Sequence, residues 1–295
     1  MARASINFRE ERDTSQKINA TFAFIRQHYQ VLARCLLVYV LPFALLSGIF
    51  SGIYLSRRLP VSSDDVPWTT WGEYDFFNSI TSFHYLISVF FSLVIYVLLS
   101  LVLCVFVVRY MQQEGKVSAG QVGEGIKRYF LPVFYASFGV ILLCCLGTVL
   151  LLVPGIYIGF ACSMFVIIMV QEELGFIDTI ERCFYLVKDH WWSTFGFLLL
   201  IGIIQALMSM IAGLPLLAVT ILRAFHVPGA DHALLTVVVT SLSGVAGIFL
   251  YVISFTGIIF QYYHLVEIKD GTGLLEQVAL IGRPAVPDYL EEDAH

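Results

Sequence analysis

Long runs of apolar residues without a single Asp, Glu, Lys or Arg dominate the pattern of this sequence. A transmembrane helix needs only about 20 such residues to cross the hydrocarbon core of a bilayer. The longest run, of 43 residues, would form a helix of roughly 65 Å, about twice that thickness. Because Pro154 and Gly155 near its middle are typical of a turn, we interpret it as two spans, which gives six in all. The five runs are Cys35–Ser56, Phe76–Val108, Tyr129–Gln171, His190–Leu222 and His232–Val266.

Amphipathic segments precede the first, third and fifth of these spans. Apolar residues that recur every three or four positions lie on one stripe of a helix. The first segment has Ile18, Phe22, Ile25, Tyr29 and Leu32 at this spacing, and the last has Ile177, Ile180, Phe184, Val187 and Trp191. The middle segment is weaker, because three glycines between positions 120 and 125 lower its helix propensity. Charged residues such as Arg182 fall off the stripe and are expected to face water.

The pattern therefore predicts an all-α polytopic membrane protein. Its six transmembrane helices form three hairpins, and a cytoplasmic amphipathic interfacial helix precedes each hairpin. We expect residues 14–266 to form this membrane domain, with residues 1–13 as an N-terminal tail and residues 267–295 as a C-terminal tail. Tryptophan and tyrosine residues in the first outer loop, around Trp68 and Trp71, are expected to form an interfacial aromatic belt.

Charge sets the expected orientation and excludes one class of partner. The chain is 58% hydrophobic and 13% charged, with a net charge of −5, so nothing in it favours nucleic acid. Of the 17 Lys and Arg residues, 14 fall on one side of the predicted membrane and only Arg57, Arg58 and Arg223 on the other. The positive-inside rule then places both termini in the cytoplasm.

Few residues are candidates for chemistry. Gln205 and Ser209 share one helix face, and with Gln261 they are candidates for a polar cavity; the alternative is hydrogen bonding between helices. Glu172 and Glu173 at the end of the fourth span could bind a cation or simply mark the water boundary. We find no residue set for catalysis, cofactor binding or metal coordination. Gly48 and Gly52 are spaced for close helix contact, which we expect within one chain.

Four segments carry a pattern shared with a known group of proteins. They are Leu151–Tyr157, Phe165–Glu173, Gly175–Trp192 and Tyr263–Gly282, and Thr179 and Cys183 stand at positions that are usually small. Together they resemble uncharacterised bacterial six-span membrane proteins, akin to the glycerophosphodiester phosphodiesterase membrane domain and to the YciC-like families. The resemblance implies a multi-pass protein of the bacterial cytoplasmic (inner) membrane. It implies no phosphodiesterase activity, because the catalytic domain of those enzymes is not part of the pattern.

The function expected from these features is non-enzymatic. We expect a scaffold or envelope-homeostasis factor whose partners are the lipid bilayer and another membrane or cytoplasmic protein. The alternative is a transporter or channel for an uncharged or lipid-like solute. An enzyme acting on lipid is the least favoured, because ionisable groups for acid, base or metal chemistry are missing from the predicted spans.

The predicted orientation can be tested with topology reporters. A reporter fused after residue 60 is expected outside the cytoplasm, and one fused to the C-terminus inside it, because the basic residues divide 14 to 3. An alkaline phosphatase fusion and a green fluorescent protein fusion at each site would measure this. The same location for both sites would contradict the orientation.

Overall fold

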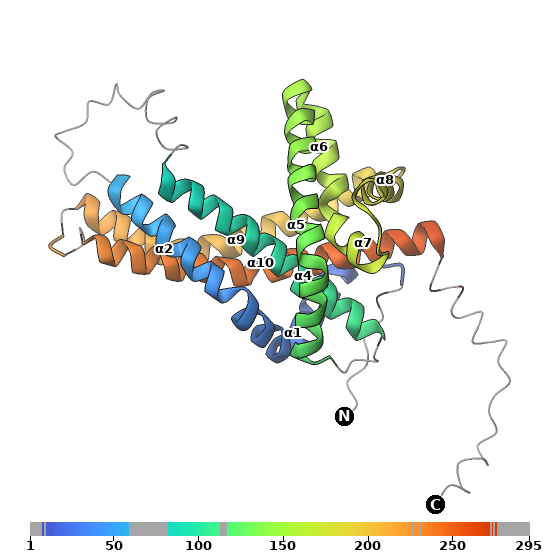
Figure 1. Ribbon diagram of the computed structural model, residues 1–295, viewed down its shortest axis with the longest axis horizontal. Coiled ribbons are helices and arrows are strands. Elements are labelled where there is room, and N and C mark those ends of the chain that lie inside the picture. The colour runs from blue at the N-terminus through green and yellow to red at the C-terminus, as the bar shows by residue number, and fades with distance from the viewer. Residues whose placement is uncertain are drawn as a thin grey trace, which may run out of the picture.

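The fold is entirely helical in the part of the chain that the structure describes. The structure is a computed structural model, and it describes residues 8, 10–58, 82–112, 117–225, 227–229, 232–271, 273 and 275 (Figure 1). The predicted all-α class is therefore confirmed. The predictions for the outer aromatic loop and for residues 276–295 of the C-terminal tail concern residues outside this described part.

Six segments of the described chain are long and apolar enough to cross a membrane. Five are straightforward spans, the third of which is interrupted by the short helix η2 (Cys162–Met164) between α6 and α7. They are α4 (Phe83–Gln112), α5 (Ala119–Leu150), α6 (Leu152–Ala161) with α7 (Phe165–Gln171), α9 (Trp191–Ala224) and α10 (Ala233–Asp270). The sixth is a broken pair, α1 (Thr14–Tyr39) and α2 (Leu41–Arg58), bent by 56°. The chain is thus an all-α polytopic membrane protein.

A proline causes the break between α1 and α2. Pro42 lies in the first turn of α2 and has no N–H to bond to the carbonyl of Val38, so a continuous helix cannot form there. The predicted first span began at Cys35, but the structure assigns Cys35 to α1 and begins the second helix at Leu41. Pro42 thus determines where α1, which contains the first amphipathic segment, ends and α2 begins.

The three amphipathic segments join their spans in three different ways. The first is part of α1 and ends at the bend, while the last is a separate helix, α8 (Phe176–Val187), which a short turn joins to α9. The middle segment is no separate helix, because α5 begins at the N-cap Ser118 and runs unbroken to Leu150. The backbone N–H of Gln121 donates to the Ser118 hydroxyl (3.4 Å), and no break signal follows between the cap and the span. The three segments are therefore similar in sequence, but only the last of them forms a separate helix.

The turn between the third and fourth spans lies earlier than predicted. Leu151 is the only residue between α5 and α6, and Pro154 falls within the first turn of α6. A proline fits there because the first N–H groups of a helix have no partner in any case. Gly155 allows the two helices to cross closely, since a Cβ at this position would lie 2.6 Å from the Cα of Thr148.

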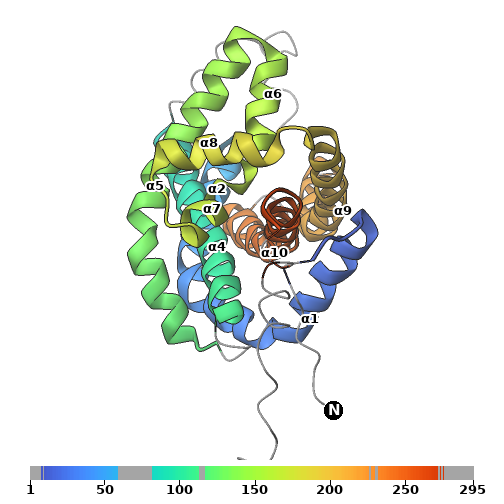
Figure 2. The same ribbon diagram turned by 90° about the vertical axis from the view of Figure 1, so that its right-hand side faces the viewer.

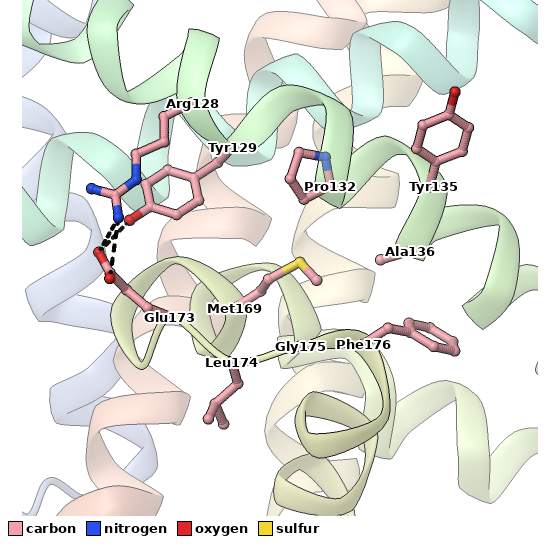
Figure 3. A pocket seen from close by; sticks show the side chains of 10 residues that line it. All are labelled: Arg128, Tyr129, Pro132, Tyr135, Ala136, Met169, Glu173, Leu174, Gly175 and Phe176. Carbon is pink, nitrogen blue, oxygen red and sulfur yellow. Dashed lines mark hydrogen bonds and ion pairs between the residues drawn. The ribbon is translucent and has the colours of Figure 1, made fainter.

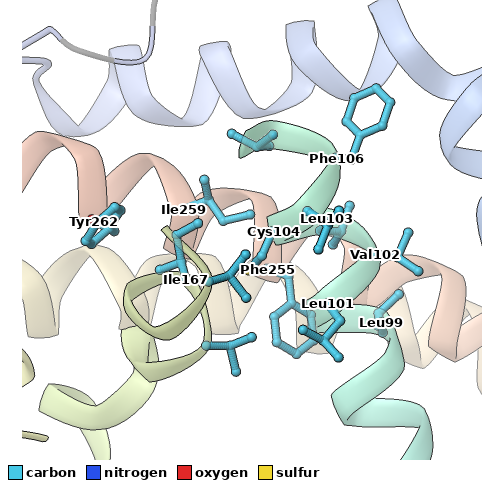
Figure 4. Close-up of a cluster of buried hydrophobic side chains, with 14 of the residues drawn as sticks. Leu99, Leu101, Val102, Leu103, Cys104, Phe106, Ile167, Phe255, Ile259 and Tyr262 are labelled. Carbon is cyan, nitrogen blue, oxygen red and sulfur yellow. The ribbon is translucent and has the colours of Figure 1, made fainter. Parts of the chain in front are cut away.

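The centre of the core is α4. Its residues from Val94 to Val107 are buried on every side apart from Tyr96, as expected for a helix surrounded by others. Figure 4 shows leucines of α4 packed against Ile167 of α7 and Phe255 of α10. The N-terminal segment also reaches this core, because the ring of Phe8 is 2% exposed and stacks on Phe260 at 4.5 Å.

The second hairpin lies across the third. In Figure 1, α5 and α6 stand upright while α9 and α10 run across the view, and in Figure 2, α10 is seen end-on while α5 and α6 lie in the plane. The tip of the α5–α6 hairpin is apolar and open, with Val149 83% and Val153 76% exposed. The helices of this protein therefore do not form a simple parallel bundle.

Glycines of α2 allow a close contact with α10. A Cβ on Gly48 would lie 2.7 Å from the Cα of Ser241, and a Cβ on Gly52 would lie 2.7 Å from the Cα of Val237, both on α10. The expectation that this glycine pair acts within one chain is confirmed.

Adding a methyl group here should destabilise the protein. Gly48→Ala and Gly52→Ala are each expected to cost about 1–3 kcal/mol, because backbone must shift to make room. Gly244→Ala is the matched control on α10, since nothing lies within 4 Å of its Cβ position. Thermal unfolding of the purified variants in detergent would measure the effect, and equal melting temperatures for all three would contradict it.

Candidate functional site

Polar and small side chains occupy one face of α10. They recur at intervals of three, four or seven residues, which places them on a single stripe of the helix. The stripe consists of Thr236, Thr240, Ser243, Gly247, Ser254, Gly257, Gln261 and His264. Between Ser254 and Gln261 it faces α9, because a Cβ on Gly257 would lie 2.2 Å from Ile201. We call this contact, Ser254–Gln261 with 194–209 of α9, the polar seam.

Gln205 forms the first cluster of the polar seam. Its side-chain amide donates to the Ser209 hydroxyl (3.0 Å), and its carbonyl oxygen accepts from the Ser254 hydroxyl (3.2 Å). Gln205 is 6% exposed, so these bonds satisfy polar atoms that water does not reach. The cluster joins α9 to α10 by the interhelical hydrogen bond that was the alternative to a cavity.

Gln261 forms the second cluster, around a buried lysine. The Lys17 ammonium donates to the Gln261 side-chain oxygen (2.8 Å), and the Gln261 amide donates to the Thr194 hydroxyl (3.1 Å). Lys17 is 1% exposed, and its Nζ lies 4.8 Å from the centre of the Phe197 ring. A buried ammonium is tolerated only with such partners. This cluster ties α1 to α9 and α10.

The three predicted site residues thus belong to two separate clusters on one seam. Ser254 and Gln261 are seven residues apart, or about 10 Å along the helix. A cavity of about 320 Å³ beside α6 is lined by Ser254, and another of about 350 Å³ is lined by Lys17, Asp13 and His264. Each cavity is therefore lined by a hydrogen-bond partner of a predicted residue, and not by Gln205, Ser209 or Gln261 themselves.

Sequence reasoning missed Lys17. In the sequence, this residue counted only as one of the 14 basic residues that set the orientation, and only one apolar stripe of the first amphipathic segment was considered. Lys17, Thr21 and Phe24 lie on another stripe of α1, and all three are at most 1% exposed. The predicted stripe residues Phe22 and Tyr29 are instead 42% and 58% exposed. The spacing of four and three residues that joins Lys17 to Phe24 was the available signal.

An ion-pair network lies where α10 ends, and we call this end of the molecule the charged end. Arg182 of α8 donates to both carboxylate oxygens of Glu172 (3.1 and 2.9 Å) and also pairs with Asp270 of α10. The Tyr262 hydroxyl donates to Glu172 (2.9 Å), and Lys269 pairs with Asp189 at 2.9 Å. The network joins the end of α7 to α8 and α10.

This network corrects the expectation for Arg182 and shows a further contact of Glu172. Arg182 does not simply face water, since its side chain is only 22% exposed and both of its partners are acidic. Burial by itself would lower the pKa of Arg182, but the hydrogen bond with Asp270 and the charge of Glu172 outweigh it and raise that pKa. Glu172 is the acceptor of this network. The partners lie 10 and 88 residues from Arg182, too far for any local pattern to indicate.

In the described part of the chain, no group of three or more His, Cys, Asp or Glu side chains is placed to hold a metal ion. Comparisons with models of protein families, with curated proteins and with solved structures find no significant match. The resemblance to six-span bacterial proteins therefore stays a prediction from the sequence.

The Lys17–Gln261 contact can be tested with a double-mutant cycle. Gln261→Leu should cost about 3 kcal/mol, because it leaves a buried ammonium without its acceptor. Replacing both partners, in Lys17→Met with Gln261→Leu, should recover most of that loss, since neither change then leaves a charge unpaired. Thermal unfolding in detergent would measure Gln261→Leu, Lys17→Met and the double variant. Simple addition of the two single effects would contradict the contact.

Proposed function

We propose that this chain is a non-enzymatic protein of the bacterial cytoplasmic membrane, with both termini in the cytoplasm. In this proposal it acts as a scaffold or envelope-homeostasis factor, and its charged end is the cytoplasmic surface that a membrane or cytoplasmic protein contacts. The observation that supports this most is the Glu172–Arg182–Asp270 network, which holds α8 at a fixed position on the membrane domain.

The surface of α8 is suited to such a role. Ile177 and Tyr185 are 76% and 47% exposed and lie on one face of α8. Asp178 and Glu181 of the same helix are also exposed and present charges to a partner. Because the network attaches α8 to both α7 and α10, these charges keep a constant arrangement. A partner can then bind without first paying the entropy of ordering the helix.

A second candidate function is supported by the polar seam. A transporter or channel for an uncharged or lipid-like solute needs polar groups across the membrane interior, and Gln205, Ser209 and Ser254 provide them there. The cavity of about 320 Å³ beside Ser254 adds space for a small solute. The two functions differ in which residues they require.

Two substitutions separate these functions. Gln205→Leu should leave the protein folded, because a hydrogen bond between membrane helices contributes only about 0.6 kcal/mol on average. If the scaffold proposal is correct, it should also complement a deletion of the gene. Arg182→Ala should abolish complementation, because α8 loses its attachment, whereas Lys188→Ala at the exposed end of α8 is the control that should complement.

The measurements are complementation and thermal stability of the inserted protein in detergent. A Gln205→Leu variant that is stable but does not complement would favour the transporter. Full complementation by Arg182→Ala would contradict the scaffold proposal.

A further inference from the structure

A cavity of about 600 Å³ lies between α5 and the connection from α7 to α8 (Figure 3). Its volume is typical of cavities that bind small molecules, which are roughly 300–1,000 Å³. Arg128, Tyr129 and Glu173 gather at one end, and Tyr135 and Phe176 lie at the other, with Met169 between them. The cavity is therefore charged at one end and apolar at the other.

One end of this cavity contains an ion pair that water can reach. The Arg128 guanidinium donates to the Glu173 carboxylate (3.2 Å), and the Tyr129 hydroxyl donates to the same carboxylate (2.6 Å). The side chains of Arg128 and Glu173 are 64% and 57% exposed. Exposed ion pairs contribute little to stability, so a ligand with both charges can replace this pair at little cost.

The position of the pair along the chain places it at the edge of the membrane. Arg128 directly precedes the 43-residue run without charges, and Glu173 lies two residues after its end. The two spans of that run leave the membrane where the pair forms. A molecule in the cavity would thus have its polar part at the water boundary and its apolar part toward the hydrocarbon.

We propose that this cavity binds the headgroup of a phospholipid that joins a phosphate to a primary ammonium, as in phosphatidylethanolamine. The phosphate accepts hydrogen bonds from the Arg128 guanidinium and the Tyr129 hydroxyl, and the ammonium donates to the Glu173 carboxylate. The glycerol and the first acyl carbons pack on Met169 and Phe176. The argument for this binding site does not rest on the scaffold function proposed above.

The chemistry of the pair selects this headgroup over other phospholipids. An anionic headgroup without an ammonium would meet the Glu173 carboxylate uncompensated, which is unfavourable. A choline headgroup carries a positive charge but no N–H, so it cannot donate to Glu173. The backbone of Glu173 is left-handed (φ 52°), a conformation uncommon for residues other than glycine, and it holds the carboxylate opposite Arg128 (Figure 3).

The apolar end continues onto the outer surface of α5. Tyr135 is 66% exposed and the neighbouring Leu131 is 57% exposed, so acyl chains that leave the cavity meet an apolar helix face. Pro132, which lines the cavity between the two ends, cannot supply the helical hydrogen bond to the carbonyl of Arg128.

Lipid binding to the full-length protein in detergent tests the proposal. Native mass spectrometry with added phosphatidylethanolamine, phosphatidylcholine or phosphatidylglycerol would give the dissociation constant of each. We expect phosphatidylethanolamine to bind about ten-fold more tightly than either of the others, equivalent to one good charged contact. Equal affinities for the three lipids would overturn the proposal.

Variants locate the site and identify the source of the headgroup. Glu173→Gln should remove the ten-fold preference, because the ammonium then loses its charged acceptor. Arg128→Ala should weaken binding of all three lipids, because each of them carries the phosphate. Lys127→Ala, a neighbouring charge that does not line the cavity, should change neither the preference nor the affinities. Melting temperatures equal to that of the wild type would show that the variants are folded. A retained preference in Glu173→Gln, or unchanged affinities in Arg128→Ala, would overturn the site. Tyr135→Ser should weaken binding of the lipid but not of soluble glycerophosphoethanolamine. If that soluble compound binds as tightly as the lipid, the site recognises a free metabolite and the lipid proposal is wrong.

Discussion

Hydrogen bonds and ion pairs of one segment of α10, from Ser254 to Asp270, hold the charged end of this protein together. Within this segment Gln261 binds Lys17 of α1 and Thr194 of α9, and Tyr262 binds Glu172 after α7. Asp270 then pairs with Arg182 of α8. Four segments that are distant in sequence thus attach to a single helix, which passes through the interior where water cannot substitute for a missing partner. The rest of the arrangement follows from which helices α10 must contact.

These contacts fix how the helices are aligned along each other, and they contribute less to the free energy of unfolding. A hydrogen bond between membrane helices contributes only about 0.6 kcal/mol on average, and the association of such helices depends largely on van der Waals packing, because lipid tails are as apolar as leucine. The packing of α4, and the close approach of Gly48 and Gly52 to α10, therefore supply most of the cohesion within the chain. The polar bonds decide which turn of α9 lies beside which turn of α10. Lys17 is the exception, because its ammonium makes an incorrect arrangement expensive.

Both proposals place function at the charged end. The network around Arg182 fixes α8 as a surface, and the pair of Arg128 and Glu173 opens a cavity at the base of the α5–α6 hairpin, directly before α8 begins. Glu172 and Glu173 are adjacent, yet one supports a structural network and the other a ligand site. Occupation of the cavity would therefore act on the connection that positions α8. A lipid at this site can stabilise the surface only if it binds the state in which that connection is formed.

Local pattern was sufficient for much of the architecture. The charge-free runs located six spans because bilayer thickness sets the length of any apolar helix that crosses it. The spacing of Gly48 and Gly52 identified a close helix contact. Gln205 and Ser209 were recognised as neighbours because residues four apart share a helix face. Each of these conclusions depends on residues within one or two turns of each other.

Contacts between different helices could be identified only from the tertiary structure. One example is the crossing of the α5–α6 hairpin over α9 and α10. Another is the set of charged partners: Arg182 pairs with residues 10 and 88 positions away, and Arg128 pairs with Glu173, 45 positions away. Lys17 shows the reason most clearly, since a lysine before a span is expected in water until a neighbouring helix offers Gln261 as an acceptor. Hydropathy and spacing report the face of a single helix. The partner that makes a charge tolerable in the interior lies on another helix, so only the assembled fold determines it.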